Sequence, residues 1–264
     1  MRYLFIAALF PAITLWAVEE NELWLYSVNE SQVTIIQYKG FSETVEIPTE
    51  IGGIPVITCG NGYEPVFPSR VINPATGKKE ENPITSITIP VQVKEISNGA
   101  FANCQTLTTV TLPDGLKTIG NSAFSGCSAL GRIQIPGSVE VIGYRAFFGC
   151  ASLTAIIIPD SVRNLGKEAF ANSSLISATI STSLNVIPDE TFLNCGSLEE
   201  VTIPVGVKKI CNKAFANCKK LKNITIPDNE VEISESAFLD CDLPLVLQEK
   251  LNKNNLKSAE KPQK

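Results

Sequence analysis

The sequence predicts a repeat solenoid, in which short parallel strands stack at about 23 residues per repeat and a cap closes each end. The stretch Val110–Ile133 contains one unit, with apolar, proline, alanine–phenylalanine and cysteine positions in an order that returns along the chain. Seven phenylalanines mark the units, at separations of 23, 23, 23, 22, 23 and 23 residues: Phe101, Phe124, Phe147, Phe170, Phe192, Phe215 and Phe238. Units this small bury their apolar faces only by stacking on one another, so a fixed period predicts a β-rich stack.

Residues 1–17 have the order of a secretory signal peptide. Arg2 supplies a positive start, an apolar run continues to Trp16, and Ala17 provides the small residue of a cleavage site. Pro11 interrupts the run, which is shorter than the roughly 18 apolar residues of a membrane span. We expect cleavage near Ala17, export, and no membrane insertion of the mature chain. The alternative is a buried N-terminal strand.

Residues 18–60 are expected to form an N-terminal β cap with a degenerate first repeat. Leu23–Val28 and Val33–Tyr38 have the β-branched and aromatic content of strands. Val45–Pro48 then reproduces the strand-and-proline phase, but no alanine–phenylalanine pair follows Gly60. Terminal repeats of solenoids are commonly atypical because one face has no neighbour, so capping is the simplest interpretation.

Residues 61–83 are expected to be an insertion loop, because they are rich in proline and glycine and carry no repeat phase. A structureless segment of this length is either functional or disordered. It also contains residue types that anchor protein interfaces: Tyr63, Phe67 and Arg70.

Residues 84–247 contain the seven repeats. Each starts with an alternating strand, which ends at a proline in every repeat except the one with Ser181, and proline cannot extend a central ladder. The phenylalanines are expected to form an internal column of rings. Residues 248–264 hold five lysines and two glutamates and are expected to be a disordered tail. A solubilising role suits this composition, and docking to a polyanion or an acidic surface is the alternative.

The composition argues against catalysis. The chain has no histidine, which removes the commonest general base and the commonest metal ligand. No glycine-rich phosphate loop or metal-spaced cluster appears, so we expect a protein that is not an enzyme and that holds no cofactor and no metal. The net charge of −5 gives no reason to expect a nucleic acid partner.

The eight cysteines would ordinarily suggest disulfides in an exported protein. Six share one repeat phase and are expected to point in parallel, which disfavours pairing between neighbouring repeats: Cys104, Cys127, Cys150, Cys195, Cys218 and Cys241. We therefore expect them to be reduced and packed as small apolar residues.

Serine and threonine dominate the outward positions of the first strand of each repeat. Threonine suits any exposed strand, and a flat threonine array could alternatively suggest ice or carbohydrate binding. Three residues in the middle repeats break the regularity: Arg132, Gln134 and Ile157. We predict a composite partner-binding site, with these three as a platform and Tyr63, Phe67 and Arg70 as anchors.

The repeat resembles the BspA-type, or treponemal-type, leucine-rich repeat of bacterial secreted and surface proteins. The resemblance covers most of residues 38–243 and is carried by motifs such as Val110–Pro113, Leu116–Gly120, Ala123–Phe124 and Cys127–Leu130. It implies a curved parallel-β solenoid and a secreted, cell-surface or periplasmic protein. It also implies an adhesin-like module that contacts an extracellular protein or glycoprotein of a host or neighbouring cell. A structural scaffold of the bacterial envelope is the alternative.

Overall fold

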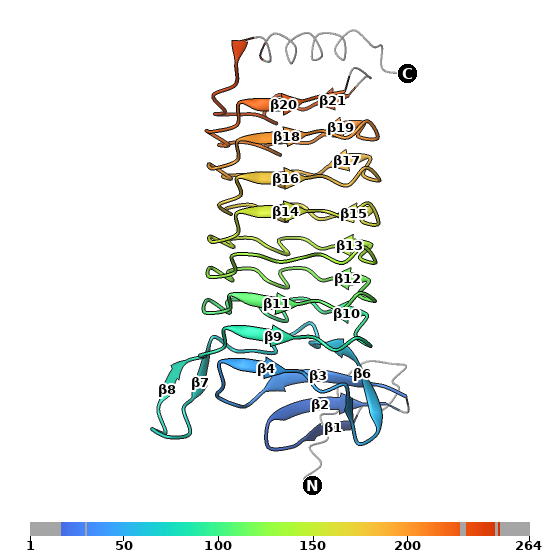
Figure 1. Ribbon diagram of the computed structural model, residues 1–264, viewed down its shortest axis with the longest axis vertical. Helices are drawn as coiled ribbons and strands as arrows, with labels where there is room; N and C mark the ends of the chain where they lie inside the picture. Colours follow the sequence, from blue (N-terminus) through green and yellow to red (C-terminus); the bar gives the residue numbers. More distant parts are fainter. Residues whose placement is uncertain (1–16, 30, 228–230, 246–247, 249–264) are drawn as a thin grey trace.

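The computed structural model describes residues 17–29, 31–227, 231–245 and 248. They form one tall stack of rungs, each built from short parallel strands joined by turns (Figure 1). The predicted repeat solenoid is confirmed. The predicted tail, apart from Gln248, and the predicted signal peptide, apart from Ala17, lie outside the described residues.

One strand of each rung belongs to a first face of the stack, which we call the platform face. Its strands run parallel in two groups, β11–β9–β4 and β14–β16–β18–β20, and no strand forms at residues 131–135 between the groups. The central residue of each strand points inward and is buried, while its neighbours point outward, as the alternation predicts. The strands are β4 (Thr44–Glu46), β9 (Ser86–Thr88), β11 (Thr109–Thr111), β14 (Ala155–Ile157), β16 (Ser177–Thr179), β18 (Glu200–Thr202) and β20 (Asn223–Thr225).

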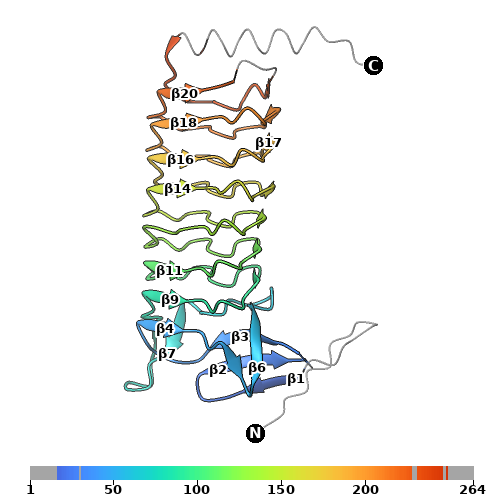
Figure 2. The same ribbon diagram turned by 45° about the vertical axis from the view of Figure 1, so that its right-hand side comes forward.

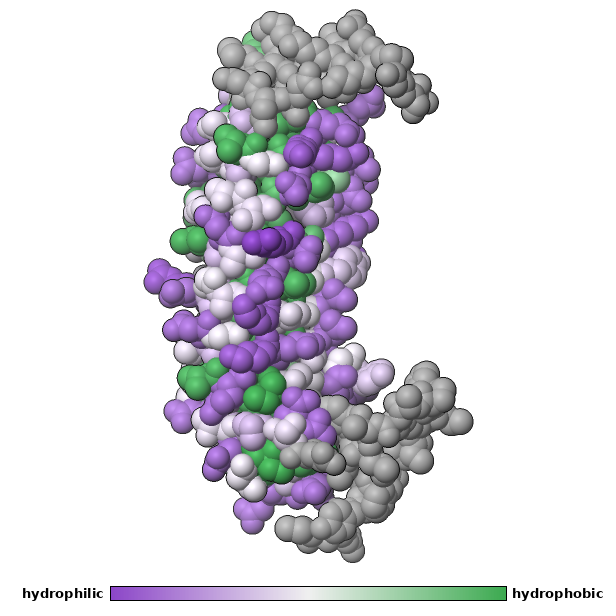
Figure 3. Space-filling model, turned by 90° about the vertical axis from the view of Figure 1, so that its right-hand side faces the viewer, coloured by the Kyte–Doolittle hydropathy of each residue, from purple (hydrophilic) through white to green (hydrophobic). Residues whose placement is uncertain are grey.

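The second strand of each rung is only two residues long and lies on another side of the stack. These strands pair in parallel from rung to rung, first as β10–β12–β13–β15 and then as β17–β19–β21. Hydrophilic side chains run along this side (Figure 3), where ion pairs such as Lys117–Glu140 join successive rungs. The strands are β10 (Glu95–Ile96), β12 (Thr118–Ile119), β13 (Val141–Ile142), β15 (Asn164–Leu165), β17 (Val186–Ile187), β19 (Lys209–Ile210) and β21 (Glu232–Ile233).

An antiparallel sheet closes the N-terminal end of the stack. Strands β1, β2 and β3 pair antiparallel in chain order, β3 then pairs parallel with β6, and β6 pairs parallel with β10 of the first full rung. The backbone therefore changes from meander to solenoid within one continuous sheet. The strands are β1 (Ala17–Glu20), β2 (Trp24–Val28), β3 (Val33–Tyr38), β5 (Glu50–Ile51) and β6 (Ile54–Cys59).

A column of stacked phenylalanine rings fills the interior of the solenoid. The rings of the seven repeat phenylalanines are nearly parallel, with centroids 5.0–5.6 Å apart. Six of the seven are fully buried, and Phe238 at the last rung is partly buried. The predicted internal column is therefore present.

The column begins one ring earlier than the repeat phase indicates. Phe67 is fully buried and stacks on Phe101 at 5.4 Å, and the rings of Tyr38 and Trp24 cover its other side. Backbone bonds also join this segment to its neighbours, because Val66 N–H donates to the Ala100 carbonyl. Val66–Phe67 thus replaces the alanine–phenylalanine pair that seemed to be missing after Gly60.

The remainder of the predicted insertion loop forms a β-hairpin. Strands β7 (Arg70–Ile72) and β8 (Lys79–Glu81) pair antiparallel and project from the side of the stack near β4 and β9 (Figures 1 and 2). The Glu80 carboxylate accepts hydrogen bonds from Asn73 Nδ2 at 2.8 Å and Thr76 Oγ1 at 2.6 Å. These bonds close the hairpin turn and lower the pKa of Glu80. The segment is therefore not the single structureless loop that its composition indicates.

Glycine follows the second strand where the rungs approach most closely. A Cβ added at Gly143 would lie 2.6 Å from the backbone nitrogen of Asn121 and 2.7 Å from the carbonyl carbon of Gly120. Gly120 and Gly166 stand in the same position, and a Cβ there would also fall within 3 Å of the backbone below. No side chain fits at these three positions, so the glycines determine how tightly these rungs stack, whereas serine, proline or cysteine holds the equivalent position in the other full rungs.

We expect Gly143→Ala to lower the free energy of unfolding by about 1–3 kcal/mol, because two rungs must separate to admit the methyl group. Gly137→Ala is a matched control, since a Cβ at Gly137 meets nothing within 4 Å. It should change stability by no more than about 0.5 kcal/mol. Urea unfolding followed by circular dichroism measures both variants, and equal midpoints would contradict this account of the glycine column.

The cysteines form a second column beside the rings. All eight are unpaired, and six of them are fully or almost fully buried. On the shared repeat phase, each thiol donates to the carbonyl of a phenylalanine in the rung below, for example Cys127 Sγ to Phe101 O at 3.1 Å and Cys150 Sγ to Phe124 O at 3.3 Å. Burial raises the pKa of Cys104 and Cys150 to about 12. Cysteine therefore serves here as a small apolar residue with one weak donor.

We expect all eight thiols to titrate with a thiol reagent after denaturation in the absence of reductant. In the native protein, only the partly exposed Cys211 and Cys241 should react quickly, because the remaining thiols are buried and protonated. Fewer than six free thiols in the denatured protein would show that disulfides form in the column.

Candidate functional site

The predicted platform residues lie exposed on the platform face. Arg132 and Gln134 flank the buried Ile133. Their segment follows β12 in the chain and lies on the platform face between the rungs of β11 and β14. Ile157 ends β14 with 67% of its surface exposed, and it is in register with Thr179 of β16. These three residues therefore share one side of the stack, as the alternation predicts.

The platform face is hollowed immediately beyond Ile157, over β16, β18 and β20. This shallow hollow of about 430 Å³ is lined by outward serine and threonine side chains, together with Glu200 and Asn223. The outward Ser177 and Thr179 supply small side chains at its first rung, with the inward Ala178 between them. Its lining residues are Ser177, Ala178, Thr179, Ile180, Thr182, Glu200, Val201, Thr202, Pro204, Asn223 and Thr225.

Polar groups in the hollow are available to a partner. The hydroxyls of Thr179, Thr202 and Thr225 make no hydrogen bond to another described residue, nor do the side chains of Glu200 and Asn223. Exposed apolar side chains lie near these polar groups. Ile157, Ile176 and Val205 are 67%, 46% and 77% exposed; Ile157 ends the neighbouring strand β14, Ile176 precedes β16, and Val205 follows β18 and Pro204. The surface therefore offers unpaired hydroxyls beside apolar contact area.

Of the three predicted anchors, one is wrong. Phe67 is fully buried in the ring column, so it cannot contact a partner. Tyr63 is 86% exposed in the turn after β6, where its backbone N–H donates to Asn61 Oδ1. Arg70 is exposed on β7, and its Nη2 donates to the Lys79 carbonyl at 3.1 Å.

The platform and the anchors do not meet in one pocket. Arg70 lines a cleft between the hairpin and the turn Asn103–Thr106, at the side of the first rungs. None of Arg132, Gln134 and Ile157 lines that cleft, and neither Tyr63 nor Arg70 lines the hollow. The structure thus separates the predicted composite site into two surfaces.

A cluster of aromatic and charged residues on the middle rungs was not anticipated from the sequence. Tyr144 and Phe148 are the only aromatic residues of positions 84–244 outside the ring column. Their rings lie 5.0 and 4.8 Å from the guanidinium carbon of Arg145, which also binds the buried Glu168 at 2.6 Å. The guanidinium is thus engaged on several sides, and the cluster joins two rungs rather than presenting a free arginine.

The described residues show no arrangement suited to metal binding. No group of three or more cysteine, aspartate or glutamate side chains converges among them in a way that could hold an ion. Within the same residues, no helix has the length and apolar character needed to cross a bilayer.

Comparisons with known proteins agree with the geometry. A family model described as the BspA type leucine-rich repeat region matches in six copies, over residues 79–196 and 117–244. No curated protein sequence matches the chain.

Solved structures give the same picture of the fold. A leucine-rich repeat protein from Bacteroides ovatus is 28% identical, with a TM-score of 0.73 over 85% of this chain and 57% of that one. This chain therefore spans a little over half the length of that protein. A leucine-rich repeat protein of T. pallidum is 26% identical, with a TM-score of 0.63 over 90% of this chain and 95% of that one.

Proposed function

Because the chain belongs to the BspA-type leucine-rich repeat family, we propose that it is an exported, non-enzymatic module that binds an extracellular protein or glycoprotein on its platform face. The observation that carries this proposal is the hydroxyl-lined hollow over β16–β20, with the exposed Ile157, Ile176 and Val205 nearby. A surface that binds a protein needs both kinds of contact: polar groups orient the partner, and apolar groups contribute affinity.

The rigidity of the stack supports the same function. Each platform strand is hydrogen-bonded to its neighbours in register, and the interior behind it is filled by the ring column. A pre-ordered surface loses little conformational entropy on binding, so weak individual contacts can sum to useful affinity.

We expect Ile157→Ser combined with Thr202→Lys to weaken binding by about tenfold or more, or about 1.4 kcal/mol, because the pair removes apolar area and places a long side chain in the hollow. The immobilised chain is tested against purified matrix glycoproteins and envelope proteins. The matched control, Val186→Ser with Thr118→Lys, makes the same changes on the other side of the stack, in β17 and β12. If the two double variants bind alike, the platform face is not the contact surface. Binding to no partner, together with a regular self-assembly, would favour the scaffold role.

Export is supported by the order of Arg2, the apolar run and Ala17 in the sequence. We expect the native protein to begin near residue 18. The intact mass of the protein recovered from its source tests this, and a cytoplasmic protein that retains Met1 would contradict it.

A further inference from the structure

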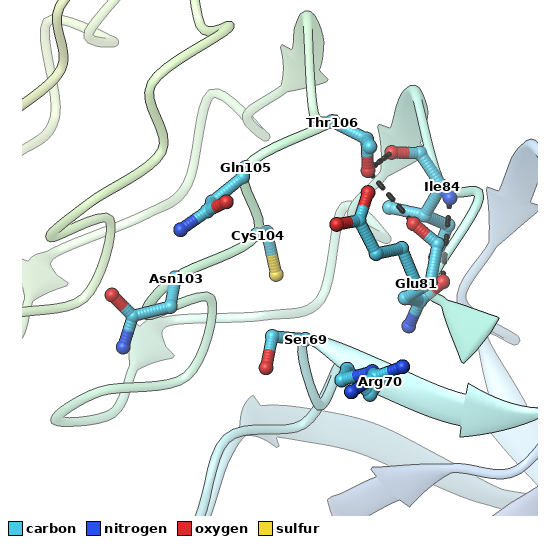
Figure 4. A pocket seen from close by; sticks show the side chains of 9 residues that line it. Ser69, Arg70, Glu81, Ile84, Asn103, Cys104, Gln105 and Thr106 are labelled. Carbon is cyan, nitrogen blue, oxygen red and sulfur yellow. Dashed lines mark hydrogen bonds between the residues drawn. The ribbon is translucent and has the colours of Figure 1, made fainter. Parts of the chain in front are cut away.

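The cleft beside the hairpin is a second candidate binding site, distinct from the platform face. It holds about 460 Å³, within the roughly 300–1,000 Å³ that small-molecule sites occupy. One wall is the hairpin, with Ser69, Arg70 and Glu81, and the other is the turn with Asn103 and Gln105 (Figure 4).

Polar contacts at the base of the hairpin fix the hairpin and join it to the turn. Asn82, at the base of the hairpin, is buried and donates from Nδ2 to the Pro68 carbonyl at 3.0 Å. The Thr106 hydroxyl lies 2.9 Å from the Asn82 carbonyl oxygen and 2.8 Å from that of Ile84. On the floor, the Cys104 thiol donates to the Phe67 carbonyl. The cleft is therefore formed before any ligand arrives.

The polar groups that face the cleft are largely unpaired. Among the described residues, the amides of Asn103 and Gln105, the Ser69 hydroxyl and the Glu81 carboxylate make no side-chain hydrogen bond. Arg70 uses one N–H on the Lys79 carbonyl, which leaves the other guanidinium donors available. The lining thus offers both donors and acceptors to a ligand. The two charges cancel, and Ile84 is the only large apolar residue of the lining.

This chemistry selects among ligands. A peptide would need an apolar pocket for an anchoring side chain, which this lining does not provide. An anion would be repelled by the Glu81 carboxylate. A neutral polyol presents hydroxyls that both donate and accept, which matches amides beside a carboxylate and a guanidinium. We infer that the cleft between the β7–β8 hairpin and the Asn103–Thr106 turn binds a neutral saccharide of one or two sugar units.

The neighbouring rungs provide a conservative way to remove the site. Asn103 has a positive φ of 61°, and Gly126 and Gly149 occupy the same position one and two rungs further on. Ser128 stands where Gln105 does. The double variant Asn103→Gly with Gln105→Ser therefore gives this turn the residues of the next rung and should fold. The matched control is Asn194→Gly, at the same turn position (φ 60°) in a rung away from the hairpin.

The experiment uses the full chain and a panel of neutral disaccharides, namely lactose, cellobiose, mannobiose and chitobiose, read by saturation-transfer NMR and calorimetry. We expect at least one sugar to bind, and the double variant and Glu81→Gln each to weaken it by about tenfold, because each removes hydrogen bonds to the sugar. Asn194→Gly should leave it unchanged. Failure of the whole panel would overturn the inference, as would equal binding by the double variant, or binding of short peptides but not of sugars. The platform proposal is independent, because none of these variants changes a strand of the platform face or a residue that lines the hollow.

Discussion

Phe147→Ala is expected to lower the free energy of unfolding by about 3–5 kcal/mol. The ring is fully buried and lies between Phe124 at 5.3 Å and Phe170 at 5.4 Å, with both neighbours nearly parallel to it. The substitution leaves a cavity in the middle of the column and removes two ring pairs, each worth about 0.5–1.5 kcal/mol beyond the area buried. The surrounding backbone cannot collapse into the space because the glycine column already holds the rungs at close approach.

Two controls test the reason for this loss, with urea unfolding as the measurement. Phe147→Leu keeps most of the volume and should cost clearly less than the alanine variant. Phe238→Ala, at the last rung, removes a partly buried ring stacked on Phe215, and it should also cost less. If Phe147→Ala costs no more than Phe238→Ala, the interior position of the ring does not determine its contribution.

The architecture could be predicted from the sequence because every rung of a stack needs similar residue types at equivalent positions. Each rung needs an inward residue in the strand and a ring for the column, so the same residue types return after 23 residues, or 22 in one case. The alternation also placed Arg132, Gln134 and Ile157 correctly on the outer surface. Wherever the period is unbroken, the place of a residue in the repeat therefore predicts its place in the stack.

Phe67 shows where this reasoning fails. It lies 34 residues before Phe101 (101 − 67), which is 11 more than one repeat (34 − 23), because the β7–β8 hairpin is inserted in between. An insertion that folds on itself leaves the stack intact in space while it breaks the phase along the chain. Two features could have signalled this: the apolar pair Val66–Phe67, and the lysine–glutamate run that forms β8.

The candidate surfaces were harder to predict because each depends on side chains from several rungs. The hollow forms where the small residues of β16 adjoin the larger Glu200 and Asn223 of β18 and β20. In the sequence, only irregularities of the repeat pointed to this region: one residue fewer between Phe170 and Phe192, and Ser181 in place of the proline of the other repeats. The cleft at Arg70 depends on contacts between the hairpin and a turn more than thirty residues later, and periodicity says nothing about such contacts.

The second large effect is expected at high pH and comes from the thiol column. Burial raises the pKa of Cys104 and Cys150 to about 12 in the folded protein, whereas an unfolded cysteine titrates near 8.5–9. The folded state therefore keeps its thiol protons after the unfolded state has released them. The stability that these thiols contribute is fully present below about pH 8.5 and is lost as the pH rises toward 12.

The double variant Cys104→Ala with Cys150→Ala isolates this contribution from the other groups that titrate in alkali. The difference in unfolding free energy, wild type minus variant, should be constant from about pH 6 to 8. It should then fall by roughly 1 kcal/mol per thiol for each pH unit between about 9 and 11. Urea unfolding at each pH measures the difference, and Cys211→Ala, at a partly exposed thiol, serves as the control with a smaller slope. A difference that stays flat to pH 11 would mean that the thiolates are tolerated inside the column, and that the thiols are not packed as the structure shows them.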